Sequence, residues 1–440
     1  MRTFFTAAIA VAMGTAFAPC QSRAAGGADV PPTPMPVEVP QGPLPSEPEP
    51  PSGLARWFNP ATAPFIPVPL ISTDPNSGST FGLIPTWVKT DANHDVSRII
   101  APDILVNENF GLGVHGRVFA YSSADEQWSM VAGIKERVER EFDFEYQMGR
   151  LRQERWSISY SLIYDRDGTP RFFGIGNETP VSGQSNYTNQ QGFGRVQVGL
   201  NLTHAWQLQY TLQLQTVDVL PGTLEDIPSI QTLYPSVYGL GTSNEVLNRL
   251  AIIYDTRDDQ SIPSRGMQWV VYGGAAAKSG LLNASSYGEY GLDARFFWPV
   301  APDTELATHM ALRYLPGSGQ VPFWALSSIG GADSHIGGEQ PLRGYGTGRY
   351  YDRNSFSTSI ELRCKVFTFD AITTKLDIEI APFVDLGTVF ARTSTVPVDE
   401  VHQVYGVGFR GIARPFVVGY VDIGHGSEGL AVFTGLNYPF

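Results

Sequence analysis

The chain of 440 residues carries 43 acidic and 30 basic side chains, and its formal net charge of −13 argues against a nucleic-acid partner, because phosphate binding requires clustered lysine and arginine. After the first 24 residues no stretch reaches the roughly twenty apolar residues that a membrane-spanning helix needs. The content of 12% aromatic residues and 46 glycines favours strands whose two faces differ in polarity.

The first 24 residues predict a secretory signal peptide. A basic start at Arg2 is followed by an apolar run over 4–18, and small residues then suit cleavage after Ala24 or Ala25. The chain is therefore expected to be exported.

The two cysteines leave one alternative open. Cys20 is compatible with a lipoprotein acylated at that residue, although Pro19 directly before it fits this poorly. If cleavage follows Ala24, Cys364 is the single remaining thiol and no intrachain disulfide can form.

Residues 25–63 predict a periplasmic linker. Ten prolines fall within 31–53, and such a composition cannot bury enough apolar surface to fold. We expect an extended tether, with a ligand tail for another protein as the alternative interpretation.

Residues 64–440 predict an all-β domain, a transmembrane antiparallel β-barrel. Along 156–165 and 206–217, apolar and aromatic residues alternate with serine or glutamine. A soluble sandwich could show this alternation too, but a row of glutamines opposite tryptophan and tyrosine fits a polar lumen and an aromatic girdle better. The expected location is the outer membrane of a Gram-negative bacterium, in contact with its lipids.

Seventeen strands can be read from the sequence, with 79–90 as the first and 429–440 as the last. Since a barrel with both ends in the periplasm needs an even number, one assignment must be wrong, and the tight spacing over 97–150 is the suspected place. Long loops at 166–189, 218–245 and 316–354 are separated by even numbers of strands. They are therefore predicted to lie together on the extracellular side.

The last residues resemble the signal that the outer-membrane assembly machinery recognises. Gly435, Tyr438 and the terminal Phe440 carry this resemblance. The alternative is an ordinary final strand, in which Pro439 is tolerated only where pairing ends.

The loop at 316–354 contains the sequence Leu-Arg-Gly-Tyr around Arg343. The strand that follows places Glu361 on its polar face, and the next strand runs into Phe-Val-Asp-Leu-Gly, which contains Asp385. An arginine can fold inward only where carboxylates meet it.

Together with Phe-Gly-Ile-Gly-Asn at 173–177 and Tyr-Asp-Thr-Arg-Asp at 254–258, these motifs resemble the bacterial surface antigen family, the superfamily of BamA, TamA and the two-partner secretion transporters. The resemblance implies sixteen strands and a sixth extracellular loop folded into the lumen. It implies that Arg343, Gly344 and Tyr345 form the loop tip and that Glu361 and Asp385 are its partners on the inner wall. The alternative is that Arg343 and Glu361 are separate surface charges.

The chain departs from the family in its N-terminal region, because the proline-rich linker leaves no room for the periplasmic POTRA repeats that collect client proteins. The resemblance therefore implies a POTRA-less barrel that assists insertion or translocation of proteins or other surface molecules, by separation of its first and last strands. A separate periplasmic partner would then replace the repeats. The alternative is a passive solute pore or a structural barrel.

No cofactor, metal site or enzymatic activity is predicted. The seven histidines show no metal-ligand spacing. Asp333, Ser334 and His335 are adjacent in sequence, so their side chains point apart and cannot form a catalytic triad by themselves.

Overall fold

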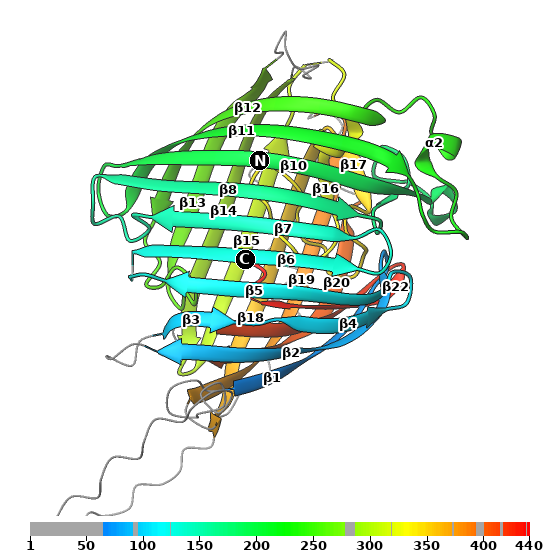
Figure 1. The fold of residues 1–440 in the computed structure, drawn as a ribbon. Helices are drawn as coiled ribbons and strands as arrows, with labels where there is room; N and C mark the ends of the chain where they lie inside the picture. The colour runs from blue at the N-terminus through cyan, green and yellow to red at the C-terminus, as the bar shows by residue number, and fades with distance from the viewer. Residues whose placement is uncertain are drawn as a thin grey trace, which may run out of the picture.

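The computed structural model describes residues 65–90, 96–123, 125–277, 287–317, 319–371, 374–392, 400–413, 417–436 and 438–440. The predicted signal peptide and linker lie outside these residues. Within them, eighteen antiparallel strands form a closed barrel (Figure 1). The strands are β1 Phe65–Asp74, β2 Gly78–Thr90, β3 Val96–Ile100 continued by β4 Asp103–Asn107, β5 Gly111–Tyr121, β6 Glu126–Lys135, β7 Arg140–Met148, β8 Trp156–Asp167, β10 Ser185–Asn201, β11 Trp206–Pro221, β12 Gly241–Asp255, β13 Gly266–Ala277, β14 Tyr287–Ala301, β15 Thr304–Tyr314, β18 Asn354–Ala371, β19 Thr374–Phe390, β20 His402–Ala413, β21 Val417–Gly426 and β22 Gly429–Leu436.

The barrel wall is apolar outside and polar inside. In β11, Trp206, Leu208 and Leu214 are 46%, 40% and 51% exposed, whereas Gln207 and Gln213 are buried against the interior. Successive side chains of a strand point to opposite faces, so each strand presents one face to lipid and one to the lumen. The prediction of an all-β transmembrane barrel is confirmed.

The strand number is eighteen, not sixteen, and the error does not lie in 97–150. The strand missing from the sequence-based prediction is β1. Pro67 and Pro69 argue against a strand because each lacks a backbone donor. They are tolerated because β1 is fully paired on only one side, with β2 over ten residue pairs.

The barrel closes between β1 and β22, not between 79–90 and 429–440. Among the described residues, the two strands form one backbone pair, Thr73 with Val432, and the Ser72 hydroxyl donates to the Val432 carbonyl at 3.1 Å. By comparison, the adjacent strands β10 and β11, elsewhere in the wall, form fifteen residue pairs. We call the β1–β22 junction the seam.

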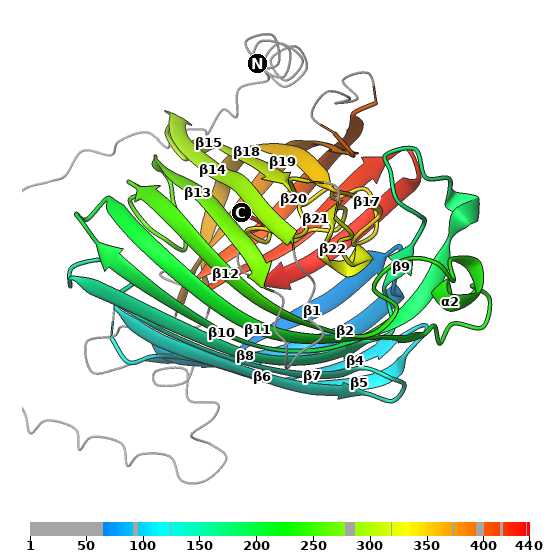
Figure 2. The same ribbon diagram turned by 90° about the horizontal axis from the view of Figure 1, so that it is seen from above.

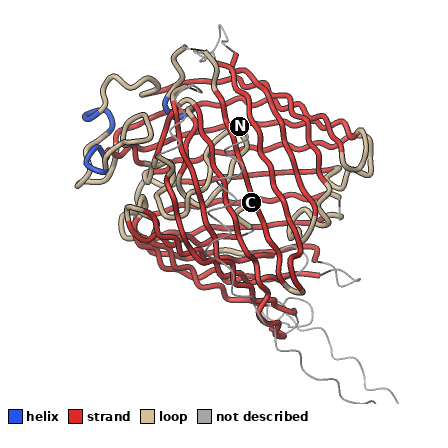
Figure 3. The backbone as a smooth tube through the Cα atoms, turned by 180° about the vertical axis from the view of Figure 1, so that it is seen from behind, coloured by secondary structure: helices blue, strands red, loops and turns tan. Residues whose placement is uncertain are grey.

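The three long connections, 168–184, 222–240 and 315–353, lie at the same end of the barrel, as the even strand spacing predicts. We call this the long-loop end. The short 3-10 and α-helical segments, Val181–Gly183, α2 at Ile230–Leu233 and Phe323–Ala325, belong to these loops (Figure 3). No helix in the described ranges is long and apolar enough to cross a membrane.

The three long loops pack against one another through an aromatic cluster. Phe172 of the short strand β9, Arg171–Phe172, lies 5.0 Å from Phe323 and 5.8 Å from Tyr351 between ring centroids. Ile230 of the second loop is completely buried in the same cluster. Burial of this apolar surface holds the third loop in a fixed position.

Candidate functional site

The third long loop, 315–353, folds into the barrel. Its two short strands, β16 at Ser327–Ile329 and β17 at Tyr350–Asp352, pair with each other and are buried, and β17 lies inside the ring of barrel strands (Figure 2). The loop therefore occupies the lumen near the long-loop end.

Arg343 lies at the inner tip of this loop and is completely buried. Its Nε and Nη2 donate to the two oxygens of Asp385 at 2.9 and 2.7 Å, and its backbone N–H donates to the same carboxylate at 3.0 Å. Its Nη1 donates to Asp422 at 2.9 Å and to Glu361. The structure thus brings together the arginine and both acids named from the sequence, and adds a third acid.

Two further arginines extend the contacts along the wall. Arg363 donates to Glu361 at 2.9 Å and to Glu305 at 3.1 Å, while Arg410 donates to Glu361 at 3.3 Å and to Asp422. We call Arg343, Arg363, Arg410, Glu361, Asp385 and Asp422 the inner-wall network. It contains three cations and three anions, and none of their side chains is exposed.

The balance of charge decides whether such burial is stable. Burial alone would lower the pKa of Arg343, but the carboxylates of Asp385, Glu361 and Asp422 raise it well above its ordinary value. The Arg343 guanidinium also lies 3.6 Å from the centroid of the Phe383 ring. Loss of any one carboxylate would leave a buried positive charge in excess, which is strongly destabilising.

Gly344 allows the close approach of the loop tip to the wall. A Cβ atom at this position would lie 2.6 Å from the backbone nitrogen of Gly426 and 2.9 Å from Val404 Cγ2. On the wall side, a Cβ at Gly424 would overlap the Arg343 carbonyl oxygen. The Tyr345 hydroxyl lies 2.9 Å from the Ser427 hydroxyl, so the tip also reaches the β21–β22 turn.

Arg410 and Asp422 were not predicted as members of this site. Both belong to strands read correctly from the sequence, and Asp422 is a lone acid between apolar residues in β21. That isolated charge in an apolar stretch could have indicated that Asp422 faces the lumen. Only the pairing of β20 with β21 in the structure shows that Arg410 and Asp422 meet.

The predicted assembly-signal residues lie in two places. The final strand ends at Leu436 and not at Phe440, so Gly435 belongs to β22. Tyr438 and Phe440 turn into the lumen, where Phe440 is 5% exposed and stacks 5.3 Å from His309. The Tyr438 hydroxyl lies 3.3 Å from Glu379. Recognition of these residues by the assembly machinery stays a prediction.

One histidine does have a serine and a carboxylate beside it. His309 Nε2 lies 2.8 Å from Asp293 and 3.5 Å from the Ser334 hydroxyl. Both contacts use the same ring nitrogen, whereas a triad needs the acid on one nitrogen and the serine on the other. Among the described residues no group of three or more His, Cys, Asp or Glu side chains suits a metal ion.

Comparison with known proteins identifies the family. Residues 126–412 match the Omp85 superfamily domain. Among solved structures, the fold is similar to BamA from Haemophilus ducreyi lacking POTRA domains 1–3, with 12% identity over 87% of this chain and 77% of that one and a TM-score of 0.49. It is also similar to CdiB from Escherichia coli, with 10% identity over 85% of this chain and 62% of that one and a TM-score of 0.43.

CdiB from Acinetobacter baumannii is similar at 14% identity over 86% of this chain and 60% of that one, with a TM-score of 0.45. The chain thus spans about three fifths of the length of either CdiB. None of the curated protein sequences with which it was compared matches it. The match to the family model covers more than half of the chain, which therefore belongs to the Omp85 superfamily of Gram-negative outer-membrane β-barrels.

Proposed function

We propose that this barrel inserts or translocates proteins or other surface molecules by opening at the seam between β1 and β22. The observation that carries the proposal is the single backbone pair between these strands, Thr73 with Val432, in the described part of the chain. Strands held by so few hydrogen bonds separate at the lowest cost in the barrel wall.

The edge of β1 supports the proposal further. If β22 continued in the register of Thr73 with Val432, the last residues of the chain would lie opposite the beginning of β1. Instead, Tyr438 and Phe440 turn inward. Among the described residues, the first half of β1 pairs only with β2, which leaves a strand edge that an extended client segment can pair with.

The contents of the lumen favour a path for the client through the seam over a path along the lumen. The third loop fills the lumen from the long-loop end, and Tyr438 and Phe440 lie deeper inside it. The inner-wall network fixes that loop to β18, β19 and β21, and β21 is the neighbour of β22. The wall on the β22 side of the seam is therefore held in order while β22 separates from β1.

The partners that we propose are outer-membrane lipids, a client that crosses or enters the membrane at the seam, and the assembly machinery that inserts the barrel itself. The linker predicted from the sequence contains no POTRA repeats. A separate periplasmic protein is therefore proposed to deliver the client.

A disulfide across the seam tests the proposal. Thr73→Cys with Val432→Cys, in a Cys364→Ser background, joins the paired residues, and Val196→Cys with Leu212→Cys is the matched control on β10 and β11. In a strain without the gene, the surface proteome and surface lipids identify the molecules that depend on it. The seam disulfide should fail to restore them until it is reduced, whereas the control disulfide should restore them. Full restoration by the oxidised seam variant would refute the proposal.

A passive pore is the second candidate, and one cavity favours it. A cavity of about 270 Å³ on the inner wall has more acidic than basic side chains in its lining: Asp74, Glu139, Glu141, Asp165 and Asp167 against Lys135 and Arg140, with His115 beside them. Carboxylates on the wall would favour cations. For a pore, Arg343→Ala should loosen the third loop and raise the conductance of single barrels in planar bilayers, and unchanged low conductance would argue against a pore.

A further inference from the structure

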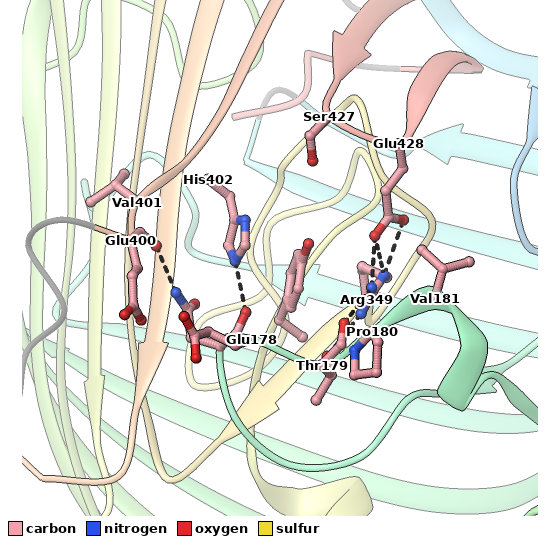
Figure 4. Close-up of a pocket in the computed structure, with 12 residues that line it drawn as sticks. Glu178, Thr179, Pro180, Val181, Arg349, Glu400, Val401, His402, Ser427 and Glu428 are labelled. Atoms are coloured by element: carbon pink, nitrogen blue, oxygen red, sulfur yellow. Dashed lines mark hydrogen bonds and ion pairs between the residues drawn. The ribbon is translucent and has the colours of Figure 1, made fainter.

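A second arginine of the third loop contacts the seam side of the barrel. Arg349, six residues after Arg343, is 3% exposed and lies at a cavity of about 470 Å³ at the long-loop end (Figure 4). Arg349 makes no contact with the inner-wall network among the hydrogen bonds and ion pairs of the described residues.

The Arg349 guanidinium joins two segments that are distant in sequence. Its Nε donates to both oxygens of Glu428 at 2.8 and 3.0 Å, and its Nη2 lies 2.6 Å from the same carboxylate. Its Nη1 donates to the Thr179 hydroxyl at 2.9 Å and its Nη2 to the Thr179 carbonyl at 2.7 Å (Figure 4). We call Arg349, Thr179 and Glu428 the outer latch.

Aromatic rings limit the access of water to the Arg349 end of the outer latch, whereas the Glu428 side chain is 27% exposed. The guanidinium lies 3.9 Å from the ring centroid of Phe173 and 4.4 Å from that of Tyr350. The Tyr350 ring is stacked in turn on His402 at 3.8 Å. Ion pairs and cation–π contacts are stronger where water is partly excluded, so this contact is worth more than an exposed ion pair.

Glu428 connects the outer latch to the seam strand β22. Glu428 and Ser427 form the two-residue turn between β21 and the seam strand β22. The Ser427 N–H donates to the Tyr345 hydroxyl at 3.1 Å. Two side chains of the third loop therefore hold the turn from which β22 starts.

The two arginines act on different parts of the wall. The acids of Arg343 belong to β18, β19 and β21, and none of them belongs to β22. Arg349 instead reaches the turn at the start of β22. In the described residues β22 forms eight backbone pairs with β21 and a single one with β1, Thr73 with Val432, near the long-loop end. The outer latch therefore adds restraint at the end of the seam where β22 meets β1.

We infer that Arg349 is a positioning residue for the seam, which holds the long-loop end of β22 in the closed position through Glu428. Release of this ion pair frees that end of β22 without disturbing the inner-wall network. The role of the outer latch in transport rests on the proposed function. The closed position of β22 does not, because it can be measured without any client.

Hydrogen exchange in lipid nanodiscs tests the inference. Glu428→Gln removes the charge at nearly constant shape, Arg349→Gln removes its partner, and Glu178→Gln is the control, an exposed acid that lines the same cavity. In either latch variant the amides of β22 should exchange faster, by on the order of tenfold, since hydrogen bonds to charged groups are lost. Exchange in β18 and β19 should stay unchanged, and Glu178→Gln should change neither region.

A double variant separates positioning from general destabilisation. If Arg349 and Glu428 act through each other, the double variant should exchange in β22 no faster than either single one. Unchanged exchange in β22 in both single variants, or equal acceleration in every strand, would overturn the inference. Faster exchange in β22 together with unaltered surface molecules in cells would leave the outer latch standing and count against the proposed function.

Discussion

Arg343 donates two side-chain hydrogen bonds and one backbone hydrogen bond to a single carboxylate, that of Asp385, inside the barrel. The planar fork of a guanidinium matches a carboxylate in this geometry, so the contact fixes both the side chain and the backbone of the loop tip. The two residues are 42 positions apart in the chain. This contact connects the third loop to β19, which lies on the β22 side of the seam.

Asp385→Asn should undock the third loop. Removal of one buried carboxylate leaves the positive charge in excess and costs about 3–5 kcal/mol. Protease cleavage within 315–353 and a lower urea midpoint in detergent micelles should report the loss. Asp226→Asn, on an exposed part of the second loop, is the control and should leave both readouts unaltered. Wild-type protection in Asp385→Asn would show that the contact does not hold the loop.

Gly344→Ala should have a similar effect through steric overlap. The added methyl group would meet backbone atoms of Gly426, which cannot move aside as a flexible side chain would. Gly411→Ala is the matched control, because a Cβ at that position meets no atom within 4 Å. We expect protease cleavage of the third loop in Gly344→Ala alone, and equal behaviour of the two variants would contradict the close approach of the loop tip to the wall.

The docking of the third loop should depend on pH through Glu339. Burial raises the pKa of this loop carboxyl to about 8, and Asp333 and Asp74 add to the shift, against a backbone hydrogen bond from Gly348. An undocked loop would lose the Glu339 proton near its ordinary pKa of 4.5, while the docked loop keeps it. Docking is therefore strongest below about pH 4.5 and weakens as the pH rises towards 8.

Hydrogen exchange of the third loop, corrected for intrinsic rates, measures this dependence between pH 5 and 8. Protection should fall as the pH rises in the wild-type chain. Glu339→Gln should abolish most of that fall, since the amide does not ionise. A pH dependence of equal size in the variant would assign it to other groups.

Much of the barrel could be predicted from the sequence, because alternation along strands such as β8 and β11 records which face meets lipid. The strand β1 could not, since its prolines suit a seam strand only once the seam is known. Arg343, Glu361 and Asp385 were named together from strand phase and family resemblance. Arg410, Asp422 and the outer latch depend on contacts between distant turns, and no local pattern encodes these.

Phe440→Ala should destabilise the barrel itself. The ring packs against His309, Phe297 and Ala307 in the lumen, and loss of a buried aromatic side chain costs about 3–5 kcal/mol. The thermal midpoint in micelles should fall, and Phe440→Leu should recover part of the loss. If the in vitro midpoint is unchanged while cells assemble less barrel, the residue acts as an assembly signal and not through packing.

The separation of β1 from β22 is measured most directly by spin labels on Thr73→Cys and Val432→Cys in lipid nanodiscs, with Val196→Cys and Leu212→Cys as the reference pair within the wall. The seam pair should give a short distance together with a second, longer one, and Glu428→Gln should enlarge the longer population. The reference pair should give one short distance throughout. A single short distance at the seam in the wild-type chain and in Glu428→Gln, as at the reference pair, would contradict opening at the seam.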